Sequence, residues 1–157
     1  MQTLQAKMPA PNFTLLDQNE QAVNLSDFLG RKVLCYFYPK AMTPGCTTQA
    51  KELRDHLSQF SAHQVTVIGI STDPTTRLAK FTARDQLNFI LLSDPEHKVA
   101  ELFGVWGEKK FMGRTYDGLH RISFLIDEAG QIEQVFTRFK TKDHHQVILD
   151  YLAQASA

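Results

Sequence analysis

Two adjacent segments of the chain have contrasting hydrophobic patterns. Residues 33–38 form a continuous apolar run rich in β-branched and aromatic side chains, which is typical of a buried strand. In the stretch 46–62, apolar residues recur three and four positions apart, as they do along one face of an amphipathic helix. These residues are Ala50, Leu53, Leu57 and Phe60. The pattern therefore predicts a strand over 33–38, a loop, and a helix over 46–62.

The middle of the chain continues this alternation. Apolar runs at 65–71 and 88–93 predict two more buried strands, and each is followed by a proline in a helix-start position, Pro74 and Pro95. Strands that alternate with helices are typical of a partly parallel sheet covered by helices.

Both ends of the chain favour antiparallel pairing instead. Short apolar runs on either side of a polar turn predict hairpins within 13–25 and 121–138, and a helix is expected to begin at Asp143. The glycine-containing stretch 105–118 has charges of both signs and is interpreted as a long loop. The expected fold is a single α/β domain over 1–157, with a central mixed β-sheet, flanking helices and an N-terminal β-hairpin.

Composition and charge exclude several classes of function. The chain has 17 basic and 17 acidic residues without a long block of either sign, so no basic face for nucleic acid is expected. The N-terminus lacks the apolar core of a signal peptide, and no segment is apolar over the length of a membrane span. Two cysteines do not make a secreted disulfide scaffold. We therefore expect a cytoplasmic protein with no membrane partner.

The chemistry of the chain is expected at the junction between strand and helix. Pro39, Pro44 and Gly45 interrupt regular structure there, which places Cys46 in the first helical turn. A helix N-terminus has unpaired N–H groups and a partial positive charge, so a cysteine there ionises more readily than a free one. The apolar stripe extended backwards from Ala50 reaches Cys46, so its sulfur should point toward the protein body. The residues alone leave two interpretations, an inert buried cysteine and a reactive thiol.

The segment around Cys46 resembles the PxxxTxxC active-site motif of peroxiredoxins, with Pro39, Thr43 and Cys46 at the three defined positions. The fuller run Tyr-Phe-Tyr-Pro-Lys-Ala-Met-Thr-Pro-Gly-Cys-Thr is similar to the bacterioferritin comigratory protein, or peroxiredoxin Q, subfamily. The likeness continues in order along nearly the whole chain. Its further stretches are 69–73, 92–94, 103–108 and 120–127.

This resemblance implies a thioredoxin-like fold and a thiol peroxidase that reduces hydrogen peroxide and organic hydroperoxides. It implies that Cys46 is the nucleophile, that Thr43 and Arg121 position the peroxide, and that Pro39 shields the sulfur. A hydroxyl and a permanently charged guanidinium suit this task, since they can stabilise charge on the departing oxygen. The backbone N–H groups of Gly45 and Cys46 are further candidate donors. No metal, flavin or haem is implied.

The chain departs from a common pattern of the family. Many relatives have a second, resolving cysteine five residues after the first, where this chain has Lys51, and no cysteine follows Cys46. The remaining cysteine, Cys35, lies in the expected strand and is expected to be buried. We therefore predict a one-cysteine cycle, in which an external thiol such as thioredoxin, glutaredoxin or glutathione reduces oxidised Cys46. The expected oligomeric state is a monomer or weak dimer.

Two other functions fit the same residues. One is a peroxide sensor that signals through oxidation of Cys46 without turnover, and the other is a glutathione-linked thiol transferase. A metal site at His144 and His145 is disfavoured, because adjacent residues of a helix diverge by about 100°. His56 and His63 are expected to be solvated.

Overall fold

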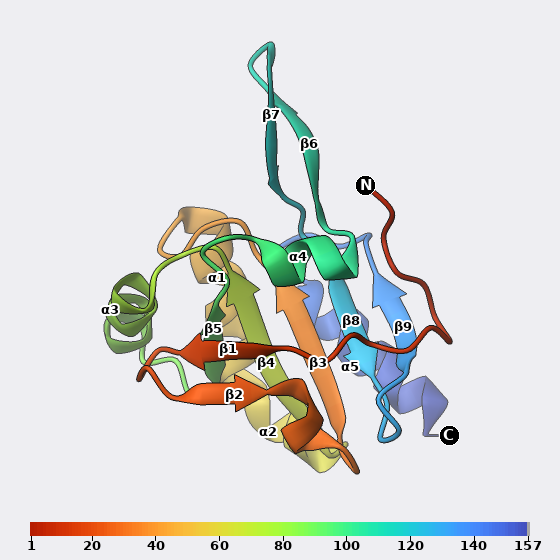
Figure 1. Cartoon of the computed structure of the whole chain (residues 1–157). Helices are drawn as coiled ribbons and strands as arrows, with labels where there is room; N and C mark the ends of the chain where they lie inside the picture. Colours follow the sequence, from red (N-terminus) through yellow and green to blue (C-terminus); the bar gives the residue numbers. More distant parts are fainter. Residues whose placement is uncertain (157) are drawn as a thin grey trace.

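The computed structural model describes residues 1–156, and its centre is a seven-stranded sheet with the strand order β2-β1-β5-β4-β3-β8-β9 (Figure 1). The strands are β1 (Thr14–Asp17), β2 (Ala22–Asn24), β3 (Lys32–Phe37), β4 (Val65–Ser71), β5 (Ile90–Ser93), β8 (Ser123–Ile126) and β9 (Ile132–Phe136). Strands β3, β4 and β5 are parallel, whereas β1 pairs antiparallel with β5 and β8 pairs antiparallel with β3. The expected mixed sheet and N-terminal hairpin are therefore confirmed.

Helices cover both faces of this sheet. They are η1 (Leu25–Phe28, a 3-10 turn), α1 (Pro44–Asp55), α2 (Leu57–Ala62), α3 (Thr75–Asp85), α4 (Lys98–Phe103) and α5 (His144–Ala155). In Figure 1, α4 lies on the near face, and α1, α2 and α5 lie behind the sheet. Within residues 1–156, no helix combines the length and the apolar character that a membrane crossing requires.

Strand β3 separates two hydrophobic cores, because successive side chains of a strand point to opposite faces. Leu34 and Tyr36 belong to the core that contains the apolar residues of α1, α2, α3 and α5. Cys35 and Phe37 belong to the other core, which includes the apolar residues of α4. Cys46 lies in the first of these cores. The two cysteines are consequently on opposite faces of the sheet.

The predicted continuous helix over 46–62 is wrong, because it consists of two helices. The chain leaves helical geometry at His56, where φ is −112° and ψ is 13°, and α2 then begins at Leu57. The apolar stripe continues across this break, since Leu53 and Phe60 are both fully buried. Hydrophobic spacing alone therefore did not reveal the interruption.

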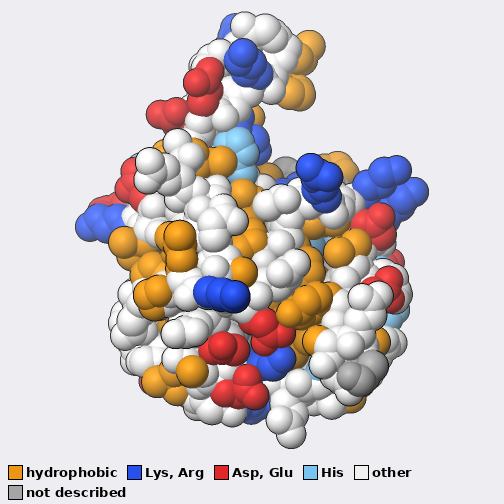
Figure 2. Space-filling view, turned by 90° about the vertical axis from the view of Figure 1, so that its right-hand side faces the viewer, with side chains coloured by type: hydrophobic (Ala, Val, Ile, Leu, Met, Phe, Trp, Pro, Cys, Tyr) orange, Lys and Arg blue, Asp and Glu red, His pale blue; other side chains and the backbone are white. Residues whose placement is uncertain are grey.

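The predicted loop over 105–118 is also wrong. It is a β-hairpin of β6 (Trp106–Phe111) and β7 (Arg114–Leu119), which projects from the body of the protein (Figures 1 and 2). The turn residues Met112 and Gly113 have φ values of 52° and 79°, as a two-residue hairpin turn of type I′ requires. Phe111 is 66% exposed and Met112 is 86% exposed. Most of the hairpin is exposed and only its base, which includes Leu119, is buried, so its strands lack the alternating hydrophobic pattern that predicts a strand.

Helix α5 is attached to the sheet by a fully buried histidine. The Nε2 atom of His144 lies 2.7 Å from the Oγ atom of Ser123, the first residue of β8. Burial, followed by the positive charges of His145 and Arg121, lowers the pKa of His144 from 6.5 to about 3. The folded protein therefore holds a neutral imidazole that the unfolded chain would protonate below pH 6.5.

This difference predicts a loss of stability in mild acid. Because the folded-state pKa is lowered, the stabilisation is present above pH 6.5 and is lost as the pH falls toward about 3. Between pH 7.5 and pH 5, His144 is expected to lower the free energy of unfolding by about 2 kcal/mol. Urea unfolding of wild type and His144→Gln across this range measures the effect. The variant should have a shallower pH dependence, whereas His63→Gln should follow wild type; equal slopes in wild type and His144→Gln would contradict the assignment.

Candidate active site

The candidate site lies where the end of β3, the start of α1 and the segment before β8 meet. Arg121 is two residues before β8, and the register of β3 and β8 pairs Tyr36 with Ser123. The backbone N–H of Phe37 donates a hydrogen bond of 3.0 Å to the carbonyl of Ile122. This antiparallel pairing brings Arg121 to the end of the strand from which the chain turns toward Cys46.

Cys46 and Arg121 are in direct contact. The Nη2 atom of Arg121 lies 3.1 Å from the sulfur of Cys46, which is only 1% exposed. A guanidinium at this distance stabilises a thiolate through its charge and through an N–H hydrogen bond. Cys46 is the third residue of α1, where the N–H groups of the helix are unpaired and also favour an anion. Two independent features, the guanidinium and the start of the helix, therefore lie beside the sulfur of Cys46.

Gln49 fixes the orientation of the Arg121 guanidinium. Its Oε1 atom accepts a hydrogen bond of 2.9 Å from Nη1 of Arg121, and Gln49 is 1% exposed. The sequence analysis missed this residue. Its position in the sequence could have indicated it. Gln49 is a polar residue three positions after Cys46, and residues three apart in a helix are neighbours.

The glycine before Cys46 leaves space for the guanidinium. A Cβ atom at Gly45 would lie 3.2 Å from Nη2 of Arg121 and 3.5 Å from Cγ2 of Thr141. A separation of 3.2 Å is closer than most carbon contacts in proteins, so a side chain here would press Arg121 away from Cys46. The lack of a side chain at Gly45 therefore leaves room for the contact between Arg121 and Cys46, whereas the expected role of its backbone N–H stays a prediction.

Thr43 and Pro39 lie in the loop between β3 and α1. Thr43 is the residue that precedes α1, and its hydroxyl donates a hydrogen bond of 2.8 Å to the carbonyl of Lys40. Within residues 1–156, no hydrogen bond joins this hydroxyl to the sulfur of Cys46, although the sequence analysis suggested that it could turn that way. Pro39 is half-buried in the same loop.

A buried carboxylate holds this loop in place. The Oδ2 atom of Asp73 accepts hydrogen bonds from the backbone N–H of Ala41 at 2.7 Å and from the Ser71 hydroxyl at 2.8 Å. Arg77 completes the attachment, because its Nη2 atom donates to the carbonyl of Ala41 at 2.6 Å and its Nε atom lies 3.3 Å from Oδ1 of Asp73. Both backbone groups of Ala41 are therefore held from the β4–α3 segment, an arrangement that the sequence did not indicate.

The projecting hairpin contributes a second cation near the site. Burial lowers the pKa of Lys109, and the positive charge of Arg121 lowers it further. The Nζ atom of Lys109 donates a hydrogen bond of 2.9 Å to the carbonyl of Leu119 on the adjacent strand. Lys109 was missed because its segment was expected to be a loop.

Cys35 is buried, as the sequence predicted. It is 0% exposed, and burial raises the pKa of its thiol to about 12. A thiol with this pKa is almost entirely protonated at neutral pH, and the protonated form is a poor nucleophile. Cys35 also belongs to the core on the far face of the sheet from Cys46.

The sequence matches the AhpC/TSA family over residues 6–135. It is 64% identical over 152 residues to the putative peroxiredoxin bcp of Haemophilus influenzae, covering 97% of this chain and 98% of the relative. It is 57% identical over 154 residues to peroxiredoxin Bcp of Escherichia coli, covering 98% of this chain and 99% of the relative.

Solved structures have the same architecture. A mutant of peroxiredoxin Q from Xylella fastidiosa superposes with a TM-score of 0.92 at 27% identity, covering 100% of this chain and 99% of that one. The bacterioferritin comigratory protein of Xanthomonas campestris gives a TM-score of 0.89 at 27% identity, covering 97% of this chain and 99% of that one. These neighbours have thioredoxin-like folds, so the fold expected from the resemblance is confirmed.

Proposed function

Because the chain belongs to the AhpC/TSA family of peroxiredoxins, which are thiol-dependent peroxidases, we propose that it reduces hydroperoxides through Cys46 alone. Its substrates would be hydrogen peroxide and organic hydroperoxides, and an external thiol would complete each cycle. The proposal rests mainly on one observation, the 3.1 Å contact between the Arg121 guanidinium and the buried sulfur of Cys46. The Xanthomonas campestris relative has alkyl peroxide reduction activity, which favours organic hydroperoxides among the substrates.

In the proposed reaction, the Cys46 thiolate attacks one oxygen of the peroxide and the O–O bond breaks. The sulfur becomes a sulfenic acid, and the departing alkoxide or hydroxide takes up a proton to form an alcohol or water. Arg121 would stabilise the negative charge that moves from the sulfur to the departing oxygen. The N–H groups of Gly45 and Cys46, in the first turn of α1, would do the same.

Thr43 and Pro39 would complete the peroxide pocket. Because the Thr43 hydroxyl donates its hydrogen bond to the carbonyl of Lys40, its oxygen would accept a hydrogen bond from the O–H of a bound hydroperoxide. In this role the Thr43 hydroxyl accepts a hydrogen bond from the peroxide, whereas the sequence analysis suggested that the hydroxyl would turn toward the sulfur of Cys46. Pro39 would limit the access of water to Cys46. Proline has no backbone N–H group, so it offers no donor that would hold a water molecule in this loop.

The one-cysteine cycle is supported by the separation of the two thiols. A disulfide requires Cα atoms about 4.4–6.8 Å apart and side chains that point toward one another. Cys35 points into the opposite core, so a bond to Cys46 would require β3 to leave the centre of the sheet. At the position where many relatives have a resolving cysteine, Lys51 is exposed on α1.

We therefore propose that an external thiol attacks the sulfur of the sulfenic acid. The thiol and Cys46 become joined in a mixed disulfide, and the hydroxyl group leaves as water after it takes up a proton. A second thiol then releases the reduced enzyme. Thioredoxin, glutaredoxin and glutathione supply thiols of the required chemistry.

The test is peroxide consumption with and without each of these thiols. Without a thiol, the protein should consume about one equivalent of peroxide and stop; with the correct thiol, consumption should continue for many turnovers. A protein that reacts once and is not restarted by any thiol would be a sensor. Exchange of mixed disulfides without peroxide consumption would indicate a thiol transferase, and either result would overturn the proposal.

A further inference from the structure

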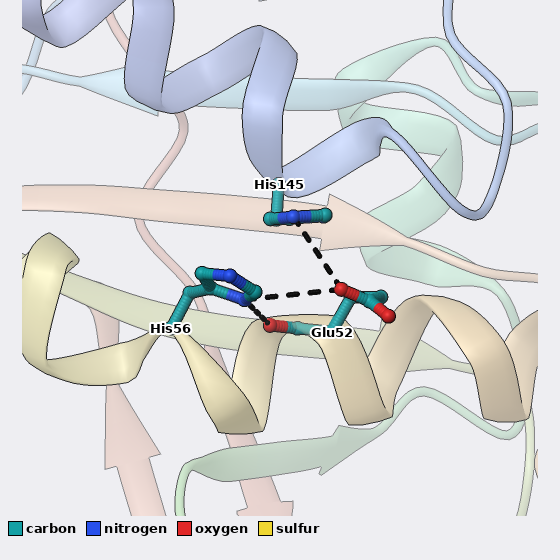
Figure 3. A group of neighbouring side chains, drawn as sticks. All are labelled: Glu52, His56 and His145. Carbon is teal, nitrogen blue, oxygen red and sulfur yellow. Dashed lines mark hydrogen bonds and ion pairs between the residues drawn. The ribbon is translucent and has the colours of Figure 1, made fainter.

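A second cluster of reactive side chains lies between α1 and α5, apart from the contact between Cys46 and Arg121. It consists of Glu52 on α1, His56 at the break after α1, and His145 on α5 (Figure 3). The Nε2 atom of His145 lies 3.4 Å from Oε2 of Glu52, and the Nδ1 atom of His56 lies 3.8 Å from the same oxygen. All three residues can offer a ligand atom within 4.8 Å of the others.

The helices create this cluster in a simple way. Glu52 and His56 are four residues apart, so they share one face of the helix. His144 and His145 diverge, as expected for adjacent helical residues: His144 turns inward to Ser123, and His145 turns to Glu52. The side chain of His56 is 29% exposed, so the expected solvation holds only in part, and its ring packs against that of His145 with centroids 4.3 Å apart.

We propose that Glu52, His56 and His145 bind a divalent transition-metal ion such as Zn²⁺. Zinc binds histidine nitrogen and carboxylate oxygen at about 2.0–2.2 Å, which places neighbouring tetrahedral ligands about 3.3 Å apart. The two observed separations, 3.4 and 3.8 Å, are close to this value. Two histidines and one glutamate form a three-ligand set whose fourth position is open to water. Imidazole ligands disfavour Mg²⁺ and Ca²⁺, which prefer oxygen.

The position of His145 agrees with this site. Its side chain is only 9% exposed and faces Glu52 across the contact between α1 and α5. Its Nδ1 atom is buried without a hydrogen-bond partner, so the contact with Glu52 is the only polar contact of the ring within the described residues.

Metal binding requires one local movement. The rings of His56 and His145 are inclined by only 30°, whereas a shared ion must lie near the plane of both rings. Rotation of the His56 side chain would meet this condition and would replace its Nδ1 contact of 2.7 Å with the carbonyl of Glu52. The side chain of His56 is 29% exposed and lies at the helix break, so it has room to rotate.

The experiment is a titration with Zn²⁺ by calorimetry and with Co²⁺ by visible absorption, on untagged full-length protein. The Cys46→Ser background removes the competing thiolate, and Cys35 is buried. The Cys46→Ser protein with an unchanged cluster should bind one metal ion at micromolar concentration. Bound Co²⁺ should show the visible absorption of a tetrahedral site. Glu52→Gln, His56→Gln and His145→Gln should each weaken binding about tenfold or more.

His63→Gln is the matched control, since it removes a histidine at the end of α2 and should leave the affinity unchanged. Circular dichroism checks that each variant is folded; if His145→Gln does not fold, the more exposed His56→Gln decides. Absence of binding at micromolar Zn²⁺, or an affinity that the cluster variants do not change, would overturn the site. The cluster would then be only a polar contact between α1 and α5.

Discussion

Replacement of Cys46 by serine is expected to lower peroxide consumption by at least about 10⁴-fold, to the background rate. Serine keeps the size of the side chain, but its hydroxyl does not ionise at neutral pH and is a far weaker nucleophile than a thiolate. Arg121, which lies 3.1 Å from the sulfur in wild type, is not itself changed, so the variant removes the nucleophile and keeps its surroundings. The measurement is the initial rate of peroxide loss with a saturating thiol donor.

Cys35→Ala is the matched control for this variant. It removes the other thiol of the chain from a core position, and it should retain nearly full activity provided that the protein is folded. Comparable losses in both variants would show that Cys35 takes part in the cycle. Residual turnover of Cys46→Ser well above background would show that Cys46 is not the nucleophile.

Arg121→Met is expected to lower kcat/KM for peroxide by about 10²–10³-fold. Methionine has a similar length but no charge and no N–H donor, so neither the thiolate nor the departing oxygen is stabilised. Gln49 would also lose the partner of its buried Oε1 atom, which adds a cost in stability. The readouts are kcat/KM for hydrogen peroxide and the urea midpoint of each variant.

Two further variants separate charge from geometry. Arg121→Lys keeps the charge but cannot contact Cys46 and Gln49 through two separate nitrogens, so its activity should fall between wild type and Arg121→Met. Arg31→Met removes an exposed arginine just before β3, at the strand end opposite the site, and should behave as wild type. If Arg121→Met is as active as Arg31→Met, the guanidinium has no role in the chemistry.

The sequence predicted the main features of the fold because they depend on burial. The apolar run that became β3 and the stripe that became α1 both face cores, so hydrophobic spacing identified them. The hairpin of β6 and β7 buries little, and its turn depends on the backbone conformation of Met112 and Gly113. A pattern of hydrophobicity contains little information about such an element.

The site was predictable to a similar degree. The motif and the strand-loop-helix junction identified Cys46, and the resemblance identified Arg121, which the structure places 3.1 Å away. Gln49, and the attachment of Ala41 to Asp73 and Arg77, depend on contacts between distant segments. Their partners cannot be read from local spacing.

Other expectations stay predictions. These are the single domain, the cytoplasmic location, the monomer or weak dimer and the identity of the thiol donor. The proposed cycle depends on none of the first three. It does require that the donor reach the sulfur of Cys46, which is 1% exposed, so the residues that cover this sulfur must move before the mixed disulfide forms.

The central claim is that one sulfur performs the peroxide chemistry and that no second thiol of the chain resolves it. The intact mass of the protein after one equivalent of peroxide, without a reductant, tests this claim most directly. We predict a gain of one oxygen atom, located at Cys46 by capture with a sulfenic-acid reagent. A loss of two hydrogen atoms, with Cys35 and Cys46 joined in one disulfide-linked peptide pair, would contradict it.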